Sequence, residues 1–116
     1  MYDDNNIFAK IIRKEIPCKS VYEDEKVLFF NDINPKATIH ILGVPKNSVI
    51  NLREFISSVD KDSVIYFFDK ALEVIKNFGL DKSGYRLITN DGKNANQEVS
   101  HFHIHILGGE NLSGLR

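Results

Sequence analysis

The sequence predicts an α+β fold, in which a sheet of about five mainly antiparallel strands carries a short N-terminal helix and one long helix. Three observations support it. Residues 60–78 repeat apolar side chains at helical spacing, short β-type runs bounded by turn residues lie on both sides of that segment, and residues 101–107 alternate between histidine and apolar residues. Because 116 residues suffice for one compact core but not for two, we expect a single domain over residues 1–116.

The first part of the chain is expected to form a helix and a hairpin. Residues 7–13 carry an apolar stripe behind Asp and Asn residues suited to the N-cap, and Pro17 ends this helix. Residues 21–22 and 27–31 form the two strands of a hairpin around a charged turn.

The remaining elements follow from turn signals and periodicity. An Asn-Pro-Lys turn precedes a strand at residues 38–44, which a proline closes. The long helix over residues 60–78 has Asp60 as its N-cap and Gly79 just after its end. Strands at 85–89 and 101–107 then flank a polar loop, and two glycines stop the last strand.

Composition limits the classes of function. The chain is 42% hydrophobic and 27% charged, as in ordinary soluble globular proteins, and no apolar run is long enough to span a membrane. Its formal net charge of −1 argues against a nucleic-acid binder. The acidic N-terminus does not resemble a secretory signal, and the single cysteine, Cys18, fits a reducing compartment. We expect a cytoplasmic protein with neither nucleic acid nor membrane as a partner.

The last strand carries the residues most suited to chemistry. Strand side chains alternate between faces, so His101, His103 and His105 share one face and the intervening apolar residues pack into the core beneath the long helix. His40 lies in another predicted strand. Three interpretations of this row are open: a solvated polar face, a metal site, and nucleophilic or acid–base chemistry by imidazole.

Chemistry at phosphorus is the interpretation that we favour. The outer histidines of the row would be about 13 Å apart, too far for all three to hold one metal ion tetrahedrally. An unperturbed pKa of about 6.5 leaves imidazole neutral and nucleophilic at physiological pH. One ring nitrogen attacks if the other donates its proton to a fixed acceptor, and a neighbouring histidine can protonate the leaving group.

The sequence resembles the histidine triad family, and within it the Hint branch. Residues 101–107 match the family's signature, in which three histidines alternate with apolar residues and a further apolar residue follows. His40 and several ordered segments agree with the branch, so the resemblance extends over residues 7–109; these segments are 7–17, 32–37, 44–46, 84–86 and 107–109. It implies that His103 is the nucleophile that forms a nucleotidyl–histidine intermediate. His105 would contact the phosphate and help to deliver a proton, while His101 and His40 would orient and polarise the site.

The resemblance also implies a nucleotide pocket. Asp32 would bind the ribose hydroxyls, and apolar residues would line the base pocket, namely Ile7, Phe8, Phe30 and Ile33. The phosphate would be surrounded by Asn90 and by the turn at Gln97 and Glu98, which would contact it through amides. No cofactor and no metal ion is expected. The chain departs from the branch at Ala95-Asn96, where a glycine is usual, and in its tail from Asn111.

The activity implied is hydrolysis of purine nucleoside 5′-phosphoramidates, which include adenosine monophosphate joined to an amine and mixed acyl-adenylates. A dinucleoside polyphosphate hydrolase and a non-catalytic nucleotide-binding scaffold are the alternatives. Retention of His105 argues against the former, because that branch tends to have glutamine there. The resemblance also implies a homodimer whose strands join into one continuous sheet.

Overall fold

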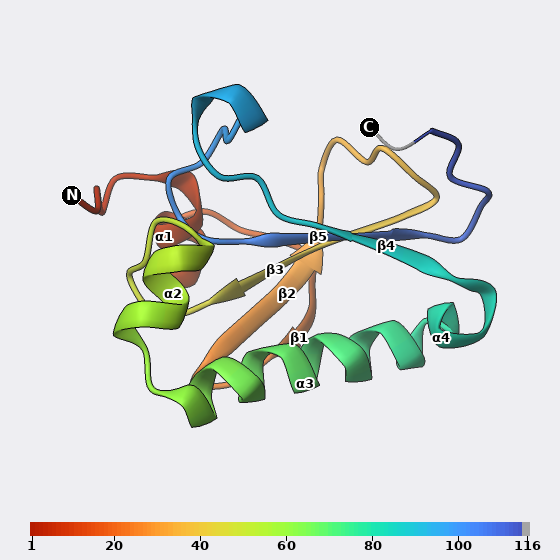
Figure 1. Ribbon diagram of the computed structural model, residues 1–116, viewed down its shortest axis with the longest axis horizontal. Coiled ribbons are helices and arrows are strands. Elements are labelled where there is room, and N and C mark those ends of the chain that lie inside the picture. Colours follow the sequence, from red (N-terminus) through yellow and green to blue (C-terminus); the bar gives the residue numbers. More distant parts are fainter. Residues whose placement is uncertain (115–116) are drawn as a thin grey trace.

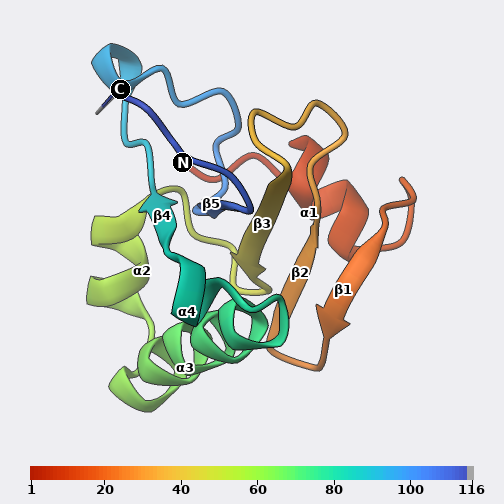
Figure 2. The ribbon, with the colours of Figure 1, turned by 90° about the vertical axis from the view of Figure 1, so that its right-hand side faces the viewer.

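Five antiparallel strands form one sheet in the order β1-β2-β3-β5-β4, with β1 and β4 at its edges (Figure 2). The structure is a computed structural model and describes residues 1–114. The strands are β1 (Ser20–Glu23), β2 (Val27–Asn31), β3 (Ile39–Pro45), β4 (Tyr85–Ile88) and β5 (Ile104–Gly108). The helices are α1 (Ile7–Ile12), α2 (Leu52–Ser58), α3 (Lys61–Asn77) and α4 (Leu80–Ser83), with a 3₁₀ turn η1 (Lys93–Ala95). The predicted α+β class and antiparallel sheet are confirmed.

Helices cover both faces of this sheet. Helix α3 lies across one face of the sheet (Figure 1). Alternate strand residues on that face form the larger core with it, and Phe29 stacks on Phe67 with ring centroids 5.6 Å apart. The residues between them face α1 and form a second cluster that includes Phe30 and Leu42. Because α1 covers part of the histidine-bearing face, that face is partly enclosed rather than open to water.

The predicted caps begin the two helices that matter most. The Asn6 side chain accepts a hydrogen bond from the Ala9 amide at 2.9 Å and starts α1. The Asp60 side chain accepts from the Ser63 amide at 3.0 Å and starts α3. After α3, Gly79 adopts a φ of 74°, the left-handed conformation that glycine tolerates best.

The last strand is shorter at its start than predicted. It begins at Ile104 rather than at His101, because the preceding backbone forms other hydrogen bonds. The carbonyl of His103 accepts from the Thr89 hydroxyl at 2.9 Å, and the carbonyl of His101 accepts from the ring of His103 at 2.7 Å. The Phe102 amide donates to the Val49 carbonyl at 2.8 Å. The alternation of faces nevertheless extends through these residues.

The sequence interpretation missed helix α2, although its capping pattern was present. Asn51 caps it by accepting from the Glu54 amide at 2.9 Å, and Glu54 accepts in return from the Ile50 amide at 3.1 Å. The other strands differ from prediction by one residue at some ends. Within residues 1–114, no helix has the length and apolar character needed to cross a membrane.

Candidate active site

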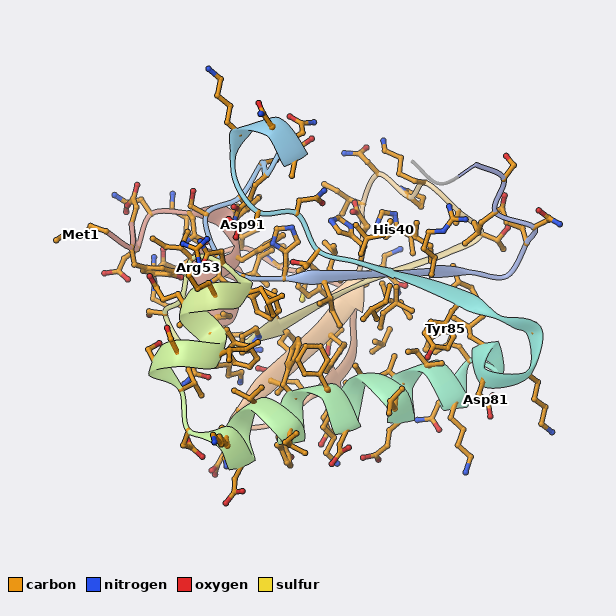
Figure 3. All side chains as sticks on the ribbon, viewed as in Figure 1. Met1, His40, Arg53, Asp81, Tyr85 and Asp91 are labelled. Atoms are coloured by element: carbon orange, nitrogen blue, oxygen red, sulfur yellow. The ribbon has the colours of Figure 1, made fainter. Side chains whose placement is uncertain are left out.

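A cleft of about 890 Å³ opens on the sheet face that α1 partly covers, and we call it the histidine cleft. His40 lies on this side, away from α3 (Figure 3). Most of the predicted site residues line the cleft, namely Ile7, Phe8, Phe30, Asp32, Ile33, His40, Asn90, Glu98, His103 and His105. Two do not: His101 lies behind the wall of the cleft and Gln97 within the adjoining loop. Residues distant in sequence therefore meet in one cleft, which contains most of the residues that the resemblance implied for a nucleotide pocket.

His103 is held in one tautomer by the backbone. Its Nδ1–H donates to the carbonyl of His101 at 2.7 Å, which leaves the lone pair on Nε2. The ring is buried and packs edge-on against Phe8, with centroids 4.8 Å apart. Burial lowers the pKa of His103 below its ordinary value, so the ring is neutral at physiological pH. A neutral imidazole with a free Nε2 is a nucleophile.

His101 is fixed from both sides. Its Nε2–H donates to the carbonyl of Pro45 at 2.8 Å, and its Nδ1 accepts from the Tyr2 hydroxyl at 2.6 Å. Burial lowers the pKa of His101 to about 4, which keeps the ring neutral. His101 is therefore a neutral ring with both nitrogens hydrogen-bonded.

His40 and His105 form a second, linked pair. Nδ1 of His40 accepts from the Lys36 amide at 2.9 Å, so its proton lies on Nε2. That Nε2–H donates to Nδ1 of His105 at 2.9 Å and also lies 3.3 Å from Oδ2 of Asp32. Since Nδ1 of His105 is an acceptor, its Nε2 carries a hydrogen. Burial is the main cause that lowers the pKa of both rings, and it lowers the pKa of His105 to about 4.

This proton arrangement bears on metal binding. One atom each from Asp32, His40 and His105 lie within 4.8 Å of one another, close enough to share an ion. A cation would need the lone pair of Nε2 of His40, but Nδ1 already accepts from the Lys36 amide, so a neutral ring carries its hydrogen on Nε2. Binding a metal there would break the Lys36 contact. The residues present therefore fit a hydrogen-bonded proton chain better than a metal centre.

The loop before β5 is organised by its own side chains. Asn90 donates to the carbonyl of Ala95 at 2.9 Å, and Gln97 accepts from the Gly92 amide at 3.0 Å and donates to the carbonyls of Ile50 and Val99. Asn96 stands where the branch usually has a glycine. It adopts φ 58° and ψ 46°, the left-handed conformation that asparagine tolerates well. The loop keeps this turn without a glycine at that position.

The apolar end of the cleft is formed by α1 and β2. Phe8 and Phe30 are buried and pack edge to face, with their ring centroids 5.7 Å apart. Ile7 and Ile33 lie at the rim, where they are 44% and 85% exposed. Further apolar lining residues had not been singled out from the sequence, namely Ile11, Ile16, Leu42 and Val99. Helical and strand alternation could have placed Ile11 and Leu42 on this side. Cys18 also lines the cleft, and burial raises the pKa of its thiol.

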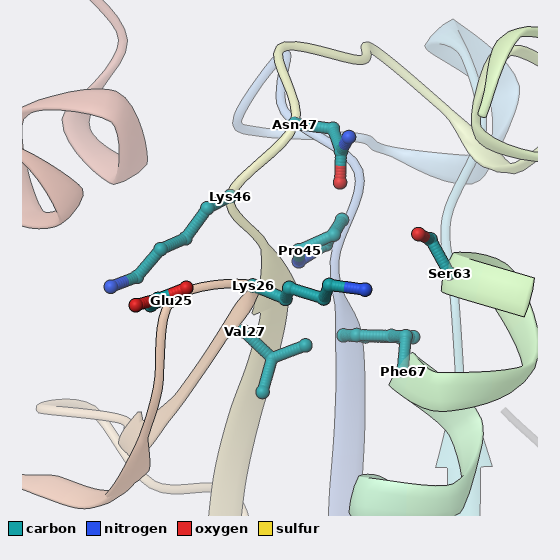
Figure 4. Close-up of a pocket in the computed structure, with 8 residues that line it drawn as sticks. All are labelled: Glu25, Lys26, Val27, Pro45, Lys46, Asn47, Ser63 and Phe67. Atoms are coloured by element: carbon teal, nitrogen blue, oxygen red, sulfur yellow. The ribbon is translucent and has the colours of Figure 1, made fainter. Parts of the chain in front are cut away.

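A second cavity of about 250 Å³ lies between the turn before β2 and the first turns of α3 (Figure 4). Lys26, Lys46, Ser63 and Phe67 are among the residues that line it, and its lining contains no histidine or cysteine. Because this second cavity has no imidazole in its lining, we take the histidine cleft as the candidate active site.

Comparisons with known proteins show the family to which the chain belongs. The family model described as the HIT domain matches residues 13–112. An uncharacterized HIT-like protein of Rickettsia prowazekii is 48% identical, over 99% of this chain and 96% of its own length. The solved structure of a HIT family hydrolase from Clostridium thermocellum is similar with a TM-score of 0.88 and 40% identity, covering 97% of both chains.

A histidine triad nucleotide-binding protein from Candida albicans is similar with a TM-score of 0.79 and 28% identity, over 97% of this chain and 86% of its own. The match to the family model covers most of the chain and contains all four histidines of the candidate site. The chain therefore belongs to the HIT domain family.

Proposed function

We propose that this protein is a nucleotide-binding hydrolase of the Hint branch that cleaves purine nucleoside 5′-phosphoramidates through a nucleotidyl–histidine intermediate. The names of similar proteins, a HIT family hydrolase and a histidine triad nucleotide-binding protein, support the general class. The observation that carries the proposal is the locked tautomer of His103. Its Nδ1–H is held by a carbonyl, so the lone pair of Nε2 is available in a cleft of nucleotide size.

The reaction follows from this arrangement in two displacements. Nε2 of His103 attacks the α-phosphorus, and the bond from phosphorus to the amine nitrogen breaks. The bound phosphate anion raises the pKa of His105, so this ring takes up a proton from solvent as the substrate binds and donates its Nε2 proton to the leaving amine, while the Nε2–H of His40 turns to Oδ2 of Asp32, 3.3 Å away. Water then attacks the phosphorus and releases the nucleoside monophosphate, while the ring of His103 is restored and His105 accepts the proton of the water.

The other site residues bind the nucleotide. Phe8 and Phe30 present flat apolar surfaces to the base, with Ile7 and Ile33 at the rim. Asp32 accepts hydrogen bonds from the ribose hydroxyls. Backbone amides near Gln97 and Glu98, together with Asn90, surround the phosphate. His40 and His101 touch no reacting atom and instead position the two histidines that do.

The charge of the cleft favours an amine leaving group over a polyphosphate. Among the described residues that line it, Lys36 is the one permanent cation, and Asp32 and Glu98 are carboxylates. A phosphoramidate monoester carries about one negative charge, whereas a dinucleoside polyphosphate carries several that would need more cations. The balance of charge therefore argues for the phosphoramidate.

We also propose a homodimer that forms along β4. Within residues 1–114 this edge strand pairs only with β5, so its outer edge is free to pair with a second copy. Tyr85 and Leu87 on β4 are each 43% exposed, and Ile65 and Leu72 on α3 are more exposed still. Pairing two such edges would continue the sheet and cover this apolar surface.

The test is turnover by wild type and His103→Ala. Wild type should hydrolyse an adenosine 5′-phosphoramidate faster than a diadenosine polyphosphate when both are assayed side by side. Loss of the nucleophile should lower kcat by roughly 10⁴-fold or more. Calorimetry should show that the variant still binds adenosine monophosphate, which demonstrates that it is folded.

Quenching wild type during turnover should reveal a nucleotide on His103 by mass spectrometry. Variant activity within tenfold of wild type would exclude His103 as the nucleophile. Faster cleavage of the polyphosphate would instead favour the dinucleoside polyphosphate hydrolase, and no turnover of either substrate would favour the scaffold.

A further inference from the structure

The N-terminal residues reach the support of the nucleophile. The Tyr2 hydroxyl donates to Nδ1 of His101 at 2.6 Å across 99 positions of sequence, and the two rings pack edge to face with centroids 5.6 Å apart. His101 is 1% exposed, so water cannot readily replace this donor. Tyr2 therefore occupies the remaining polar position on a ring whose other nitrogen is bound to Pro45.

Tyr2 directly precedes the turn that begins α1, and that turn is well ordered by hydrogen bonds. The amide of Asn5 donates to the Asp3 side chain at 2.9 Å, and the Asn6 side chain donates to the carbonyl of Asp3 at 2.8 Å. Asn6 also caps α1, and Arg13 in the following turn donates to the carbonyl of Asp4 at 2.9 Å. The segment before α1 is thus anchored to the helix that presents Phe8 to His103.

The contact of Tyr2 is transmitted to the nucleophile through one carbonyl. His101 holds the Nδ1–H of His103 with its own backbone oxygen, at 2.7 Å. The side chain of His101 is fixed by Tyr2 and Pro45, and its peptide unit is held by the Phe102 amide, which donates to the Val49 carbonyl at 2.8 Å. Tyr2 therefore provides one of three contacts that determine where that oxygen lies. If Tyr2 lost its hydroxyl, a buried ring nitrogen would have no partner, and residue 101 could shift to relieve it.

We propose that Tyr2 is a positioning residue for the nucleophile: through His101 its hydroxyl keeps His103 in the tautomer whose Nε2 is free to attack. The predicted effect of Tyr2 on kcat rests on the proposed function, whereas its predicted effect on the tautomer of His103 does not. Residues Tyr2 to Asn6 thereby become part of the active site, although the triad signature lies at the other end of the chain.

The test is Tyr2→Phe, which removes the hydroxyl and retains the ring that packs on His101. We expect kcat for an adenosine phosphoramidate to fall roughly three- to tenfold, the factor that loss of one neutral hydrogen bond produces. KM and the affinity for adenosine monophosphate should stay unchanged, because Tyr2 does not line the cleft. Nitrogen-15 NMR at neutral pH should show a bare Nε2 on His103 in wild type and a mixture of tautomers in the variant.

Tyr22→Phe is the matched control. Its hydroxyl donates to Asp24 at 2.7 Å, in a partly buried network with Tyr66 that stabilises the β1–β2 turn. This control should lower the thermal midpoint and leave kcat and the His103 spectrum as in wild type. Tyr2→Phe with a lowered midpoint but an unchanged kcat and spectrum would overturn the proposal, since Tyr2 would then only stabilise the fold.

The NMR readout separates this inference from the proposed function. A changed His103 spectrum in a protein that hydrolyses no phosphoramidate would support the role of Tyr2 and refute the substrate assignment. An unchanged spectrum in an active phosphoramidase would do the reverse.

Discussion

Asp32 offers a quantitative test of where the ribose binds. Its Oδ1 accepts from the Asn34 amide at 2.8 Å, and its Oδ2 lies 3.3 Å from Nε2 of His40. An ionised carboxylate has about four acceptor positions, so about two remain. That is the number that the 2′ and 3′ hydroxyls of a ribose require. The side chain is only 19% exposed, so these hydrogen bonds would be partly shielded from water.

The expected magnitude follows from these two hydrogen bonds. A hydrogen bond to a charged acceptor contributes about 1.5–3 kcal/mol. Removing both hydroxyls from the substrate should therefore lower kcat/KM by about 10²–10⁴, because a poorly hydrated carboxylate loses its partners. Asp32→Ala should lower kcat/KM for the ribonucleotide by a similar factor. It should leave the variant nearly indifferent to the hydroxyls.

The assay is a double-mutant cycle in which the second change is made in the substrate. Values of kcat/KM are measured for an adenosine phosphoramidate and its 2′,3′-dideoxy analogue, with wild type and Asp32→Ala. Asp62→Ala, which removes an exposed carboxylate from α3, should discriminate as wild type does. If Asp32→Ala still preferred the ribose form as strongly as wild type, Asp32 would serve only the turn at Asn34, and the nucleotide would bind elsewhere.

Three further predictions follow from the structure. Burial lowers the pKa of His101 to about 4, so between pH 6.5 and 4 the unfolded chain binds more protons than the folded one. The free energy of unfolding should therefore fall by about 3 kcal/mol over that range from His101 alone, and urea titrations that gave equal stability at both ends would contradict this. Dialysis against a chelator should leave phosphoramidate turnover unchanged, whereas a loss that zinc restores would favour a metal mechanism. Light scattering of the wild type should give a mass of twice the 13.3 kDa of one chain, and Leu87→Glu should lower that mass to 13.3 kDa. A wild-type mass of one chain at micromolar concentration would refute the dimer.

The fold was largely predictable because its signals are local. The helix at α3 follows from apolar spacing and the Asp60 cap, and the sheet follows from short alternating runs between turns. The alternation of residues 101–107 correctly separated the histidine face from the core face. It overestimated the strand, because the carbonyls of His101 and His103 are bound by side chains instead of a neighbouring strand.

The cleft was predictable only in part. The resemblance indicated most of the residues that line it, since a motif preserves residue types in order. It gave no sign of Tyr2 or of the Lys36 amide, because neither contact has a local sequence signal. The hydrogen bonds of Gln97 within its loop were likewise invisible, as a side-chain amide finds its partners only when the chain has folded.

By itself the sequence determined the class of fold, the row of imidazoles on one face of a strand, and the family that such a row resembles. Only the tertiary structure decided the protonation pattern of that row. Which nitrogen of His103 carries the hydrogen depends on the carbonyl of His101, and which nitrogen of His40 does so depends on the amide of Lys36. Strand periodicity assigns a side chain to a face, but a tautomer is set by a hydrogen-bond partner a few ångströms away, and that partner is in place only once the chain has folded.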